Sequence, residues 1–555
     1  MTNLSLRELS IPDLWRLETI GINDPTETLS KKEEELAHDL FLKELTRSED
    51  GRYRVGLPWT CINSNIPSNR NEAERRLFST TRRLQKLSKF EDYDLVFKEW
   101  KKNVIQEVSK KELEEVGGHY LCYHPVIKPE SATTSIRPVF DASCKVGRAP
   151  SLNDCLFKGP NLIEEIPTIL LRFREKAIAV VSDIRRPFLQ IEVKEEDRRF
   201  LRFLSWEKEN IIKVCQHNRI LFGATCSPFL LSAVIRHHLN KYPKQFKTVT
   251  DRLLKSFYID NCVISVDTAS ELEEIISKST GITAEAKMDL RLWQSGPVRE
   301  IKKLSTENKS LFKEDLITPV SVLGIKWDRK EDCLMICNKF DAETENPTKR
   351  KFLSITQGIY DPIGFLIPSL LPAKLMIQEA WSAKSEWDSP LPEKIQKDFQ
   401  KWYSELKQLS NLKVNRRIGY GNKEKWSIHV SCDASQNAYA TVIFLSCEDN
   451  NRISVQLLGA KSRLAPKETL TIPSLELLSC VLGSRLANYI REALDIPTIP
   501  VYYWTDSSTD IAWIRRNDQW GTFVGNRIRE KCKLPESYQW YLVPGNLNPP
   551  AISWL

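Results

Sequence analysis

The sequence predicts a multidomain protein of mixed α/β and α+β structure, with a helical lead, two mixed helix-and-strand units and a helical connector between them. Three observations support this prediction. The chain has 555 residues, enough for about three or four domains of ordinary size. Hydrophobic residues make up 41% of it, which is enough to form buried cores. Short β-rich runs alternate with helical patterns over residues 119–335 and again from residue 424 onward.

The helical segments are recognised by their apolar spacing. In the lead, "KKEEELAHDLFLKEL" places Leu36, Leu40 and Leu45 at helical intervals. Residues 69–116 are helical and basic, so their Arg and Lys side chains either contact phosphates or form an ordinary solvated face. The connector, residues 350–415, contains the helical pattern "PLPEKIQKDFQKWYSELKQL".

Composition narrows the class of protein. Lys and Arg total 81 against 73 acidic residues, a net charge of +8, which suits a nucleic-acid partner and a plain solvated surface equally well. The 13 cysteines are scattered, and the closest pair, Cys333 and Cys337, has no histidine nearby, so we expect reduced thiols in an intracellular protein rather than a zinc site. There is no apolar signal core and no stretch of about 20 apolar residues, so no membrane span is expected.

Two carboxylates stand at strand ends in the first mixed unit. "AIAVVSDIRRPFLQIEV" is an apolar strand that delivers Asp183, where a rigid element would hold an exposed acid for a cation. In "SFYIDNCVIS", two short strands flank Asp260-Asn261, which we interpret as a two-residue hairpin connector. Taken alone, this motif is either only a tight turn or a metal site.

Two neighbouring motifs carry polar or small residues. "SIRPVFDAS" places Arg137 and Asp141 in a strand, and the planar guanidinium of Arg suits bidentate contact with phosphate. In "LFGATCSPFLLSAVIRHHL", Gly223 permits close backbone approach, and Ser227-Pro228 opens a helix with Ser as its cap and Pro in its first turn. The alternative for this segment is an ordinary capped helix.

A second group of acids lies near the C-terminus. Asp433 lies in the strand pair "WSIHVSCDASQNAYATVIFL". Glu476 is predicted in the first turn of a helix that starts near Pro473, and Asp506 ends the strand in "VYYWTDSSTDIAWI". The alternative is a generic mixed sheet with ordinary acids at its strand ends.

The order of the motifs "RPVFDAS", "DIRRPFLQI", "FGATCSPFLL", "FYIDN" and "VLGIKW" resembles the fingers and palm of reverse transcriptases, and more closely the pol region of BEL/Pao-type retrotransposons. The strand-Asp, helix-Glu, strand-Asp order resembles a ribonuclease H-like domain. The resemblance implies a helical lead with part of the fingers (1–105), fingers and palm (106–335), a helical thumb or connection (336–420) and a truncated ribonuclease H-like domain (421–555).

The same resemblance implies an RNA-directed DNA polymerase that acts on a primed RNA or DNA template with deoxynucleoside triphosphates, beside other gag-pol products, in the cytoplasm or in virus-like particles. Mg²⁺, or Mn²⁺, would be held by acids of two sets: Asp183 and Asp260, with Asn261 beside them, and Asp433, Glu476 and Asp506. Arg137 would contact the triphosphate, and Phe188 would exclude a 2′-hydroxyl. The other residues implied in the nucleotide and template pocket are Asp141, Phe222, Gly223, Ser227, Pro228 and Lys287.

Three positions depart from the family pattern. Asn261 replaces a second Asp, Pro187 replaces a small residue before the aromatic gate, and Ala551 falls where a fourth nuclease acid is expected. Two alternatives therefore stand beside the polymerase: a catalytically decayed remnant that at most binds nucleic acid, and a Pao-type aspartic peptidase. The peptidase lacks an Asp-Thr/Ser-Gly signature, and the nearest approach to it is Asp267-Thr268-Ala269.

Overall fold

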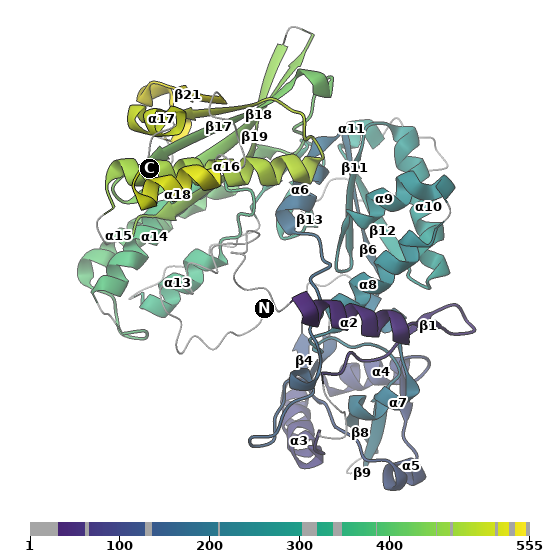
Figure 1. The fold of residues 1–555 in the computed structure, drawn as a ribbon. Helices are drawn as coiled ribbons and strands as arrows, with labels where there is room; N and C mark the ends of the chain where they lie inside the picture. Colours follow the sequence, from purple (N-terminus) through teal and green to yellow (C-terminus); the bar gives the residue numbers. More distant parts are fainter. Residues whose placement is uncertain are drawn as a thin grey trace. The chain divides into compact units, whose positions relative to one another are not determined.

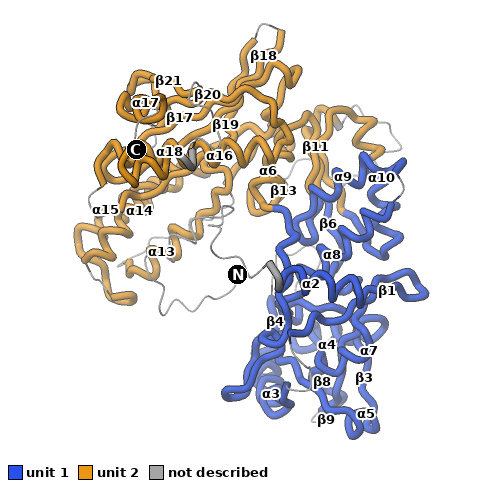
Figure 2. Tube along the Cα trace, viewed as in Figure 1, with its two compact units in different colours: residues 1–164, 182–262, 275–291 blue, residues 165–181, 263–274, 292–555 orange. Residues whose placement is uncertain are grey.

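The computed structural model describes residues 31–550 except 61–65, 128–135, 209–210, 243, 302–318, 337–346, 384–385, 451, 467–469, 517–519 and 532–538. The chain divides into two compact units, residues 1–164, 182–262 and 275–291, and residues 165–181, 263–274 and 292–555 (Figure 2). The departure at Ala551 lies outside the described residues. The domain boundaries predicted from the sequence stay predictions.

The first unit consists of small sheets and helices (Figure 1). Its sheets are β1-β2-β7 (Thr46–Arg47, Tyr53–Val55, Glu192–Val193), β3-β9-β8 (Ile105–Glu107, Ile211–His217, Arg202–Lys208) and β4-β5 (Cys122–Ile127, Ile136–Asp141). Its helices are α2 (Lys31–Glu44), α3 (Arg70–Lys86), α4 (Phe90–Trp100), α5 (Lys110–Glu115), α7 (Glu195–Arg198), α8 (Ser227–Asn240) and α9 (Lys247–Leu254). Helix α2 and strand β5 confirm the sequence predictions for those segments.

An aromatic core holds the first unit together. Helix α3 turns Leu77 and Leu84 inward at helical spacing, and it packs on β4. Phe140 on β5 meets Phe203 on β8 with ring centroids 5.1 Å apart in an edge-to-face arrangement. His217, fully buried, lies edge-on to Phe140 at 4.5 Å. The β4-β5 hairpin is therefore anchored by aromatic packing.

A four-stranded sheet with the order β10-β11-β6-β12 carries the first pair of acids. Its strands are β6 (Ile178–Ile184), β10 (Phe257–Tyr258), β11 (Asn261–Val266) and β12 (Leu290–Gly296), and the helices that follow are α10 (Ala269–Glu285) and α11 (Val298–Ile301). The hairpin is present, but its predicted connector is wrong by one residue. Tyr258 pairs with Asn261, so the turn residues are Ile259 and Asp260.

In the second unit, α6 (Ile166–Glu175) lies beside an antiparallel sheet of β13 (Val320–Val322), β14 (Ile325–Asp328), β15 (Cys333–Met335) and β16 (Val414–Asn415). A buried ion pair joins these elements. The guanidinium of Arg416 donates to both carboxylate oxygens of Asp332 at 2.6 and 2.7 Å, and to the carbonyl oxygens of Phe173, Lys176 and Ala177. Removing either charge would leave the other buried and uncompensated.

The helical connector forms α13 (Lys349–Gly358), α14 (Ile367–Ser382) and α15 (Glu393–Glu405). Helix α14 packs against β19 (Arg452–Leu464) of the last sheet, where Ile367 joins a buried cluster with Val442 and Ala460. Gly364, with φ of 90°, lies so close that a Cβ there would be 2.1 Å from the carbonyl oxygen of Ala460. The connector thus covers one part of the last sheet.

The last sheet has the order β19-β18-β17-β20-β21. Strands β17 (Trp426–Ala434), β18 (Ala438–Asp449) and β19 (Arg452–Leu464) are antiparallel, while β20 (Val501–Thr505) and β21 (Trp540–Leu542) continue it in parallel. Helix α16 (Ile472–Leu494) packs along β17 and β18, followed by α17 (Ser508–Arg515) and α18 (Thr522–Lys531) (Figure 1). Gly483 permits the close contact, since a Cβ there would lie 2.6 Å from the Cys432 sulfur.

In the part of the chain that the structure describes, no helix is both long enough and apolar enough to cross a membrane.

Candidate active sites

Three carboxylates of the second unit meet at the ends of β17, β20 and α16. One oxygen from each of Asp433, Glu476 and Asp506 lies within 4.8 Å of the others. Asp433 is in the penultimate position of β17, and Asp506 directly follows β20, which runs parallel to β17, so both strands deliver their acids to one edge. Glu476 lies in the second turn of α16, not the first as predicted, because the helix starts at Ile472.

Burial raises the pKa values of two of these acids. Asp433 and Glu476 are 6% and 7% exposed. Burial, with the charge on Asp506, raises the pKa of Asp433 to about 6. Burial raises the pKa of Glu476 to about 9, and the charges of Asp433, Asp506 and Asp510 add to this effect. Ionising all of these carboxyl groups together is therefore costly unless a cation binds between them.

The triad fits a divalent cation. Its oxygens are the donors that Mg²⁺ prefers, and Oε2 of Glu476 is buried without a hydrogen-bond partner among the described residues. The Ala434 amide donates to Asp433 Oδ1 at 2.8 Å, which fixes that carboxylate. Asp433, Glu476 and Asp506 are the residues that would hold the ion.

The sequence prediction missed a fourth acid at this site. Asp510, fully buried in the first turn of α17, is close enough to raise the pKa of Glu476. Its backbone amide donates to the Ser507 hydroxyl, which caps the helix, at 3.2 Å. The sequence contains a signal for this acid. Ser507 is followed three residues later by Asp510, a capping pattern that places Asp510 at the start of a helix beside Asp506.

The segment before the C-terminus also reaches the triad. The Asn548 amide donates to the Cys432 carbonyl oxygen at 3.0 Å and makes a longer contact, 3.4 Å, with Asp506 Oδ1. Gly545 leaves room for Asp506, because a Cβ there would lie 3.0 Å from the carboxylate. Asn548 and Gly545 thus hold Asp506 in place from the other side.

The first unit brings together the other predicted acids. Asp183 is the sixth residue of β6, and Asp260 lies in the β10-β11 turn. The Asp260 carbonyl oxygen accepts a hydrogen bond from the Ile184 amide at 2.8 Å, which ties the turn to the end of β6. Burial raises the pKa of Asp260, and the nearby charge of Asp183 raises it further, while the Arg137 guanidinium lowers it. Asp183, Asp260 and Arg137 therefore share one site.

Asp183 also fits a cation. Its Oδ1 atom is buried and has no hydrogen-bond partner among the described residues. Burial raises the pKa of Asp183; Arg291 opposes this shift, and Asp289 adds to it. The sequence prediction missed Asp289 and Arg291, which flank the start of β12 at alternate positions.

The turn that carries Asp260 has an unusual backbone. Ile259 has φ of 56°, a conformation that is costly for a β-branched side chain. Asn261 lies in β11, and its amide donates to Asp260 Oδ1 at 3.0 Å. In this arrangement the Asn261 side chain supports Asp260.

An aromatic pair lies in the same unit as these acids. Phe188, buried in the turn after β6, meets Phe222 edge-on with centroids 4.4 Å apart, and Phe222 is 49% exposed. Gly223 has φ of 109°, and a Cβ there would lie 2.0 Å from the Phe140 carbonyl oxygen on β5. The predicted close approach at Gly223 is confirmed.

One predicted detail differs from the structure. Helix α8 does place Pro228 in its first turn, but the N-cap is Cys226, and the Ser227 hydroxyl donates to the Leu221 carbonyl oxygen at 2.7 Å. The cap prediction for Ser227 is therefore wrong, because Ser227 is already helical.

Lys287 is exposed and lies beside the turn at Gly51, while Arg291 is the cation next to Asp183. Asp141 ends β5 and accepts from the Ser143 amide at 3.1 Å.

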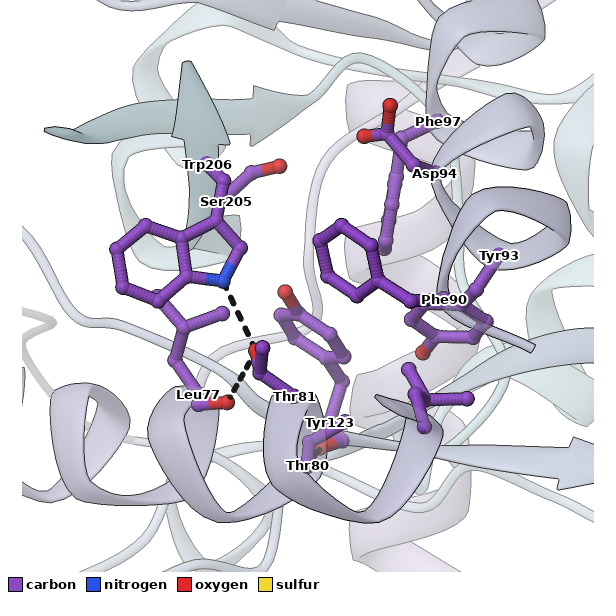
Figure 3. Close-up of a pocket in the computed structure, with 11 residues that line it drawn as sticks. Leu77, Thr80, Thr81, Phe90, Tyr93, Asp94, Phe97, Tyr123, Ser205 and Trp206 are labelled. Carbon is purple, nitrogen blue, oxygen red and sulfur yellow. Dashed lines mark hydrogen bonds between the residues drawn. The ribbon is translucent and has the colours of Figure 1, made fainter. Parts of the chain in front are cut away.

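Other candidate sites are weaker. Oxygen and sulfur atoms of Asp328, Glu331 and Cys333 also lie within 4.8 Å of one another, but the Lys413 ammonium already pairs with both acids. Figure 3 shows a cavity between α3, α4, β4 and β8, bordered by Tyr93 and Trp206. Its volume of about 20 Å³ suits roughly one water molecule, so it is not a nucleotide site.

Comparisons with known proteins agree with this geometry. Residues 348–507 match the family model described as the Pao retrotransposon-like RNaseH-like domain. This segment includes Asp433, Glu476 and Asp506, and it confirms the resemblance to Pao-type pol proteins over that range. No curated protein matches the chain at a significant level.

Solved structures show the same fold. The foamy viral protease-reverse transcriptase dRH bound to double-stranded DNA has a TM-score of 0.54 and 14% identity, covering 96% of this chain and 81% of that one. The foamy viral protease-reverse transcriptase bound to double-stranded DNA gives 0.51 and 14% over 96% and 97% of the two chains. Its complex with an RNA/DNA hybrid gives 0.50 and 15% over 96% and 62%. The predicted polymerase and ribonuclease H-like fold class is confirmed.

Proposed function

We propose that this chain, a Pao retrotransposon-type protein by its match over residues 348–507, is an RNA-directed DNA polymerase with an associated ribonuclease H-like nuclease. One observation supports the proposal above all others. Half-buried or buried carboxylates from separate elements converge in both units, Asp183 with Asp260 in one and an acidic triad in the other. Such convergence is costly unless it serves to bind cations.

In the polymerase site, each residue has a separate task. Asp183 and Asp260 would hold Mg²⁺ or Mn²⁺, which when bound polarises phosphate oxygens and lowers the pKa of a primer 3′-hydroxyl. Arg137, whose charge reaches Asp260, would orient the triphosphate of the incoming deoxynucleotide. Phe188, held by Phe222, would lie under the sugar and exclude a 2′-hydroxyl.

In the nuclease site, Asp433, Glu476 and Asp506 would hold the cation that hydrolyses the RNA strand of a hybrid. Because the pKa of Glu476 is about 9, this group carries a proton at neutral pH, whereas Asp433, with a pKa of about 6, is mostly ionised there. Cation binding is therefore expected to release protons. Asp510 adds negative charge without facing solvent.

Two other functions compete with this proposal. A catalytically decayed remnant is the alternative that Asn261 and Pro187 suggest, and it predicts no nucleotide incorporation. The peptidase has less support. Asp267 pairs with Lys176 at 2.8 Å, and an aspartic protease needs two carboxyl groups that share a proton.

Primer extension by the purified chain tests the proposal. We expect Mg²⁺- or Mn²⁺-dependent incorporation of deoxynucleotides on an RNA template, lost in Asp183→Ala and kept in Asp251→Ala, which removes an exposed acid of the same unit. No incorporation with either ion would contradict the proposal. Recovery of activity in Asn261→Asp would then identify a decayed polymerase.

A further inference from the structure

One asparagine side chain joins two segments of the first unit that lie about 70 residues apart in sequence. The Asn153 amide nitrogen donates to the Ser143 hydroxyl at 2.8 Å and to the Gly223 carbonyl oxygen at 3.0 Å. Its amide oxygen accepts from the Thr225 backbone amide at 2.8 Å. The loop after β5 and the turn before α8 are thereby linked through one carboxamide.

The chemistry of these contacts requires asparagine. The carboxamide offers two N–H donors and one acceptor oxygen, and this arrangement uses both donors and the oxygen. An aspartate has the same shape but no donor, so its charge would face the Gly223 carbonyl oxygen. An alanine would remove all three hydrogen bonds and leave the Thr225 amide without this acceptor.

The turn that Asn153 holds is also fixed on its other side. Gly223 packs so closely on β5 that a Cβ would lie 2.0 Å from the Phe140 carbonyl oxygen. Next to it, the half-exposed Phe222 ring leans on Phe188. Asn153 therefore sets the position of Phe222 and Gly223 relative to the strand that carries Arg137 and to the proposed sugar gate.

We propose that Asn153 is a positioning residue that holds the Phe222–Thr225 turn in place for the incoming nucleotide. This inference rests on the proposed polymerase function and deepens it. Asn153 acts through the turn, because its side-chain carboxamide forms hydrogen bonds with Ser143, Gly223 and Thr225. Its role is to keep Phe222 against Phe188 and Gly223 against β5.

A purely structural role makes a different prediction. Asn153 is partly exposed, and hydrogen bonds in such places contribute little to global stability. If the contacts only stabilise the fold, substitution would lower stability and all kinetic constants together. If they position the turn, substitution would mainly weaken nucleotide binding.

The test compares Asn153→Ala and Asn153→Asp with Asn161→Ala, a matched control whose amide oxygen only accepts from the Ile163 amide within its own loop. We expect both Asn153 variants to raise KM for deoxynucleotide roughly ten- to a hundredfold, with melting temperature and primer–template affinity unchanged. Ser143→Ala removes only the outer contact, so its effect should be severalfold at most. Hydrogen exchange of residues 222–227 should speed up in the Asn153 variants and not in Asn161→Ala.

Each outcome is decisive. Unchanged exchange over 222–227 overturns the contact itself, whether or not the chain is a polymerase. Faster exchange with unchanged KM in an active enzyme overturns the positioning role. A lower melting temperature, together with weaker primer–template binding and a higher KM, identifies a structural role instead. An inactive wild-type chain defeats the proposed function, and the positioning role fails with it.

Discussion

The two acidic sites balance negative charge in different ways. In the first unit, Arg137 opposes the charge around Asp260, and Arg291 opposes it around Asp183. In the triad, by contrast, every charged side chain that shifts the pKa of Glu476 is another acid. The triad depends on positive charge from solution, whereas the first site already contains part of it and is suited to a substrate that brings further negative charge.

The backbones of the two sites differ as well. Asp433, Asp506 and Glu476 lie in or directly beside long regular elements, β17, β20 and α16. Asp260 lies in a two-residue turn whose other residue, Ile259, has a positive φ. The triad is therefore a rigid site, and the first site includes a strained turn that neighbouring strands hold in place.

The largest predicted effect is at the triad. Glu476→Gln should reduce cleavage of the RNA strand in an RNA/DNA hybrid by about a thousandfold, because it removes a central carboxylate of the proposed cation site. Primer extension should continue, since Asp183 and Asp260 belong to the other unit. The measurement is cleavage of a labelled hybrid and extension of a labelled primer by the same preparation.

The matched control is Glu492→Gln, which neutralises an exposed glutamate on the same helix, α16. Its cleavage rate should equal that of the wild type. Residual cleavage by Glu476→Gln within tenfold of the wild-type rate would mean that the triad is not the nuclease site.

The sequence predicted the acids better than their surroundings. Asp183, Asp433 and Asp506 follow apolar runs, and such runs reliably become buried strands that end at a polar residue. Local patterns do not report which distant groups a fold brings together. Arg291 reaches its site only through strand pairing, so it was not predicted; the capping pattern at Ser507 indicates a helix start at Asp510, but not that helix packing brings this acid to Glu476. The hairpin turn was misplaced by one residue because a positive φ at Ile259 contradicts its intrinsic preference.

The second prediction separates the two units by their response to pH. Burial lowers the pKa of His217 to about 3, and neither ring nitrogen has a hydrogen-bond partner among the described residues. Because the pKa of His217 is lower in the folded than in the unfolded chain, the folded state loses stability as pH falls below the unfolded pKa. The loss is about 2 kcal/mol at pH 5. The second unit responds in the opposite direction. The pKa values of Asp433 and Glu476 are raised in the folded state, so these acids destabilise the fold as pH rises.

His217→Phe should therefore reduce the acid sensitivity of the first unit, and His119 and His238, whose pKa values burial also lowers, should account for part of what remains. Its ring would join Phe140 and Phe203, which already surround the position. Denaturant melts at pH 7 and pH 5, with unit-resolved hydrogen exchange as the readout, measure the difference. Equal acid sensitivity in wild type and variant would show that His217 is not the group responsible.

The third prediction makes the first site resemble the triad. Asn261→Asp adds a third carboxylate beside Asp260 and removes the amide that donates to it at 3.0 Å. We expect Mg²⁺ to bind about tenfold more tightly, because an added negative ligand strengthens a hard-cation site. The concentration of Mg²⁺ at half-maximal extension gives the result, with Asn240→Asp at the end of α8 as the control.

An unchanged Mg²⁺ requirement in Asn261→Asp would show that this side chain does not face the cation. In that case the Asn261 side chain would serve only to hydrogen-bond Asp260. The difference between the two sites would then not come from the number of carboxylates that each contains.

The smallest predicted effect concerns the strained turn. Ile259→Gly should raise the free energy of unfolding by up to about 1 kcal/mol, because glycine adopts the φ of 56° without strain but loses more chain entropy on folding. Ile259→Val keeps the branched side chain and should leave stability nearly unchanged. The same Gly variant should extend primers more slowly, since a looser turn holds Asp260 less firmly opposite Asp183. A destabilised Gly variant would mean that packing of the Ile259 side chain outweighs the backbone strain, and the contrast between a strained site and a regular one would then be energetically unimportant.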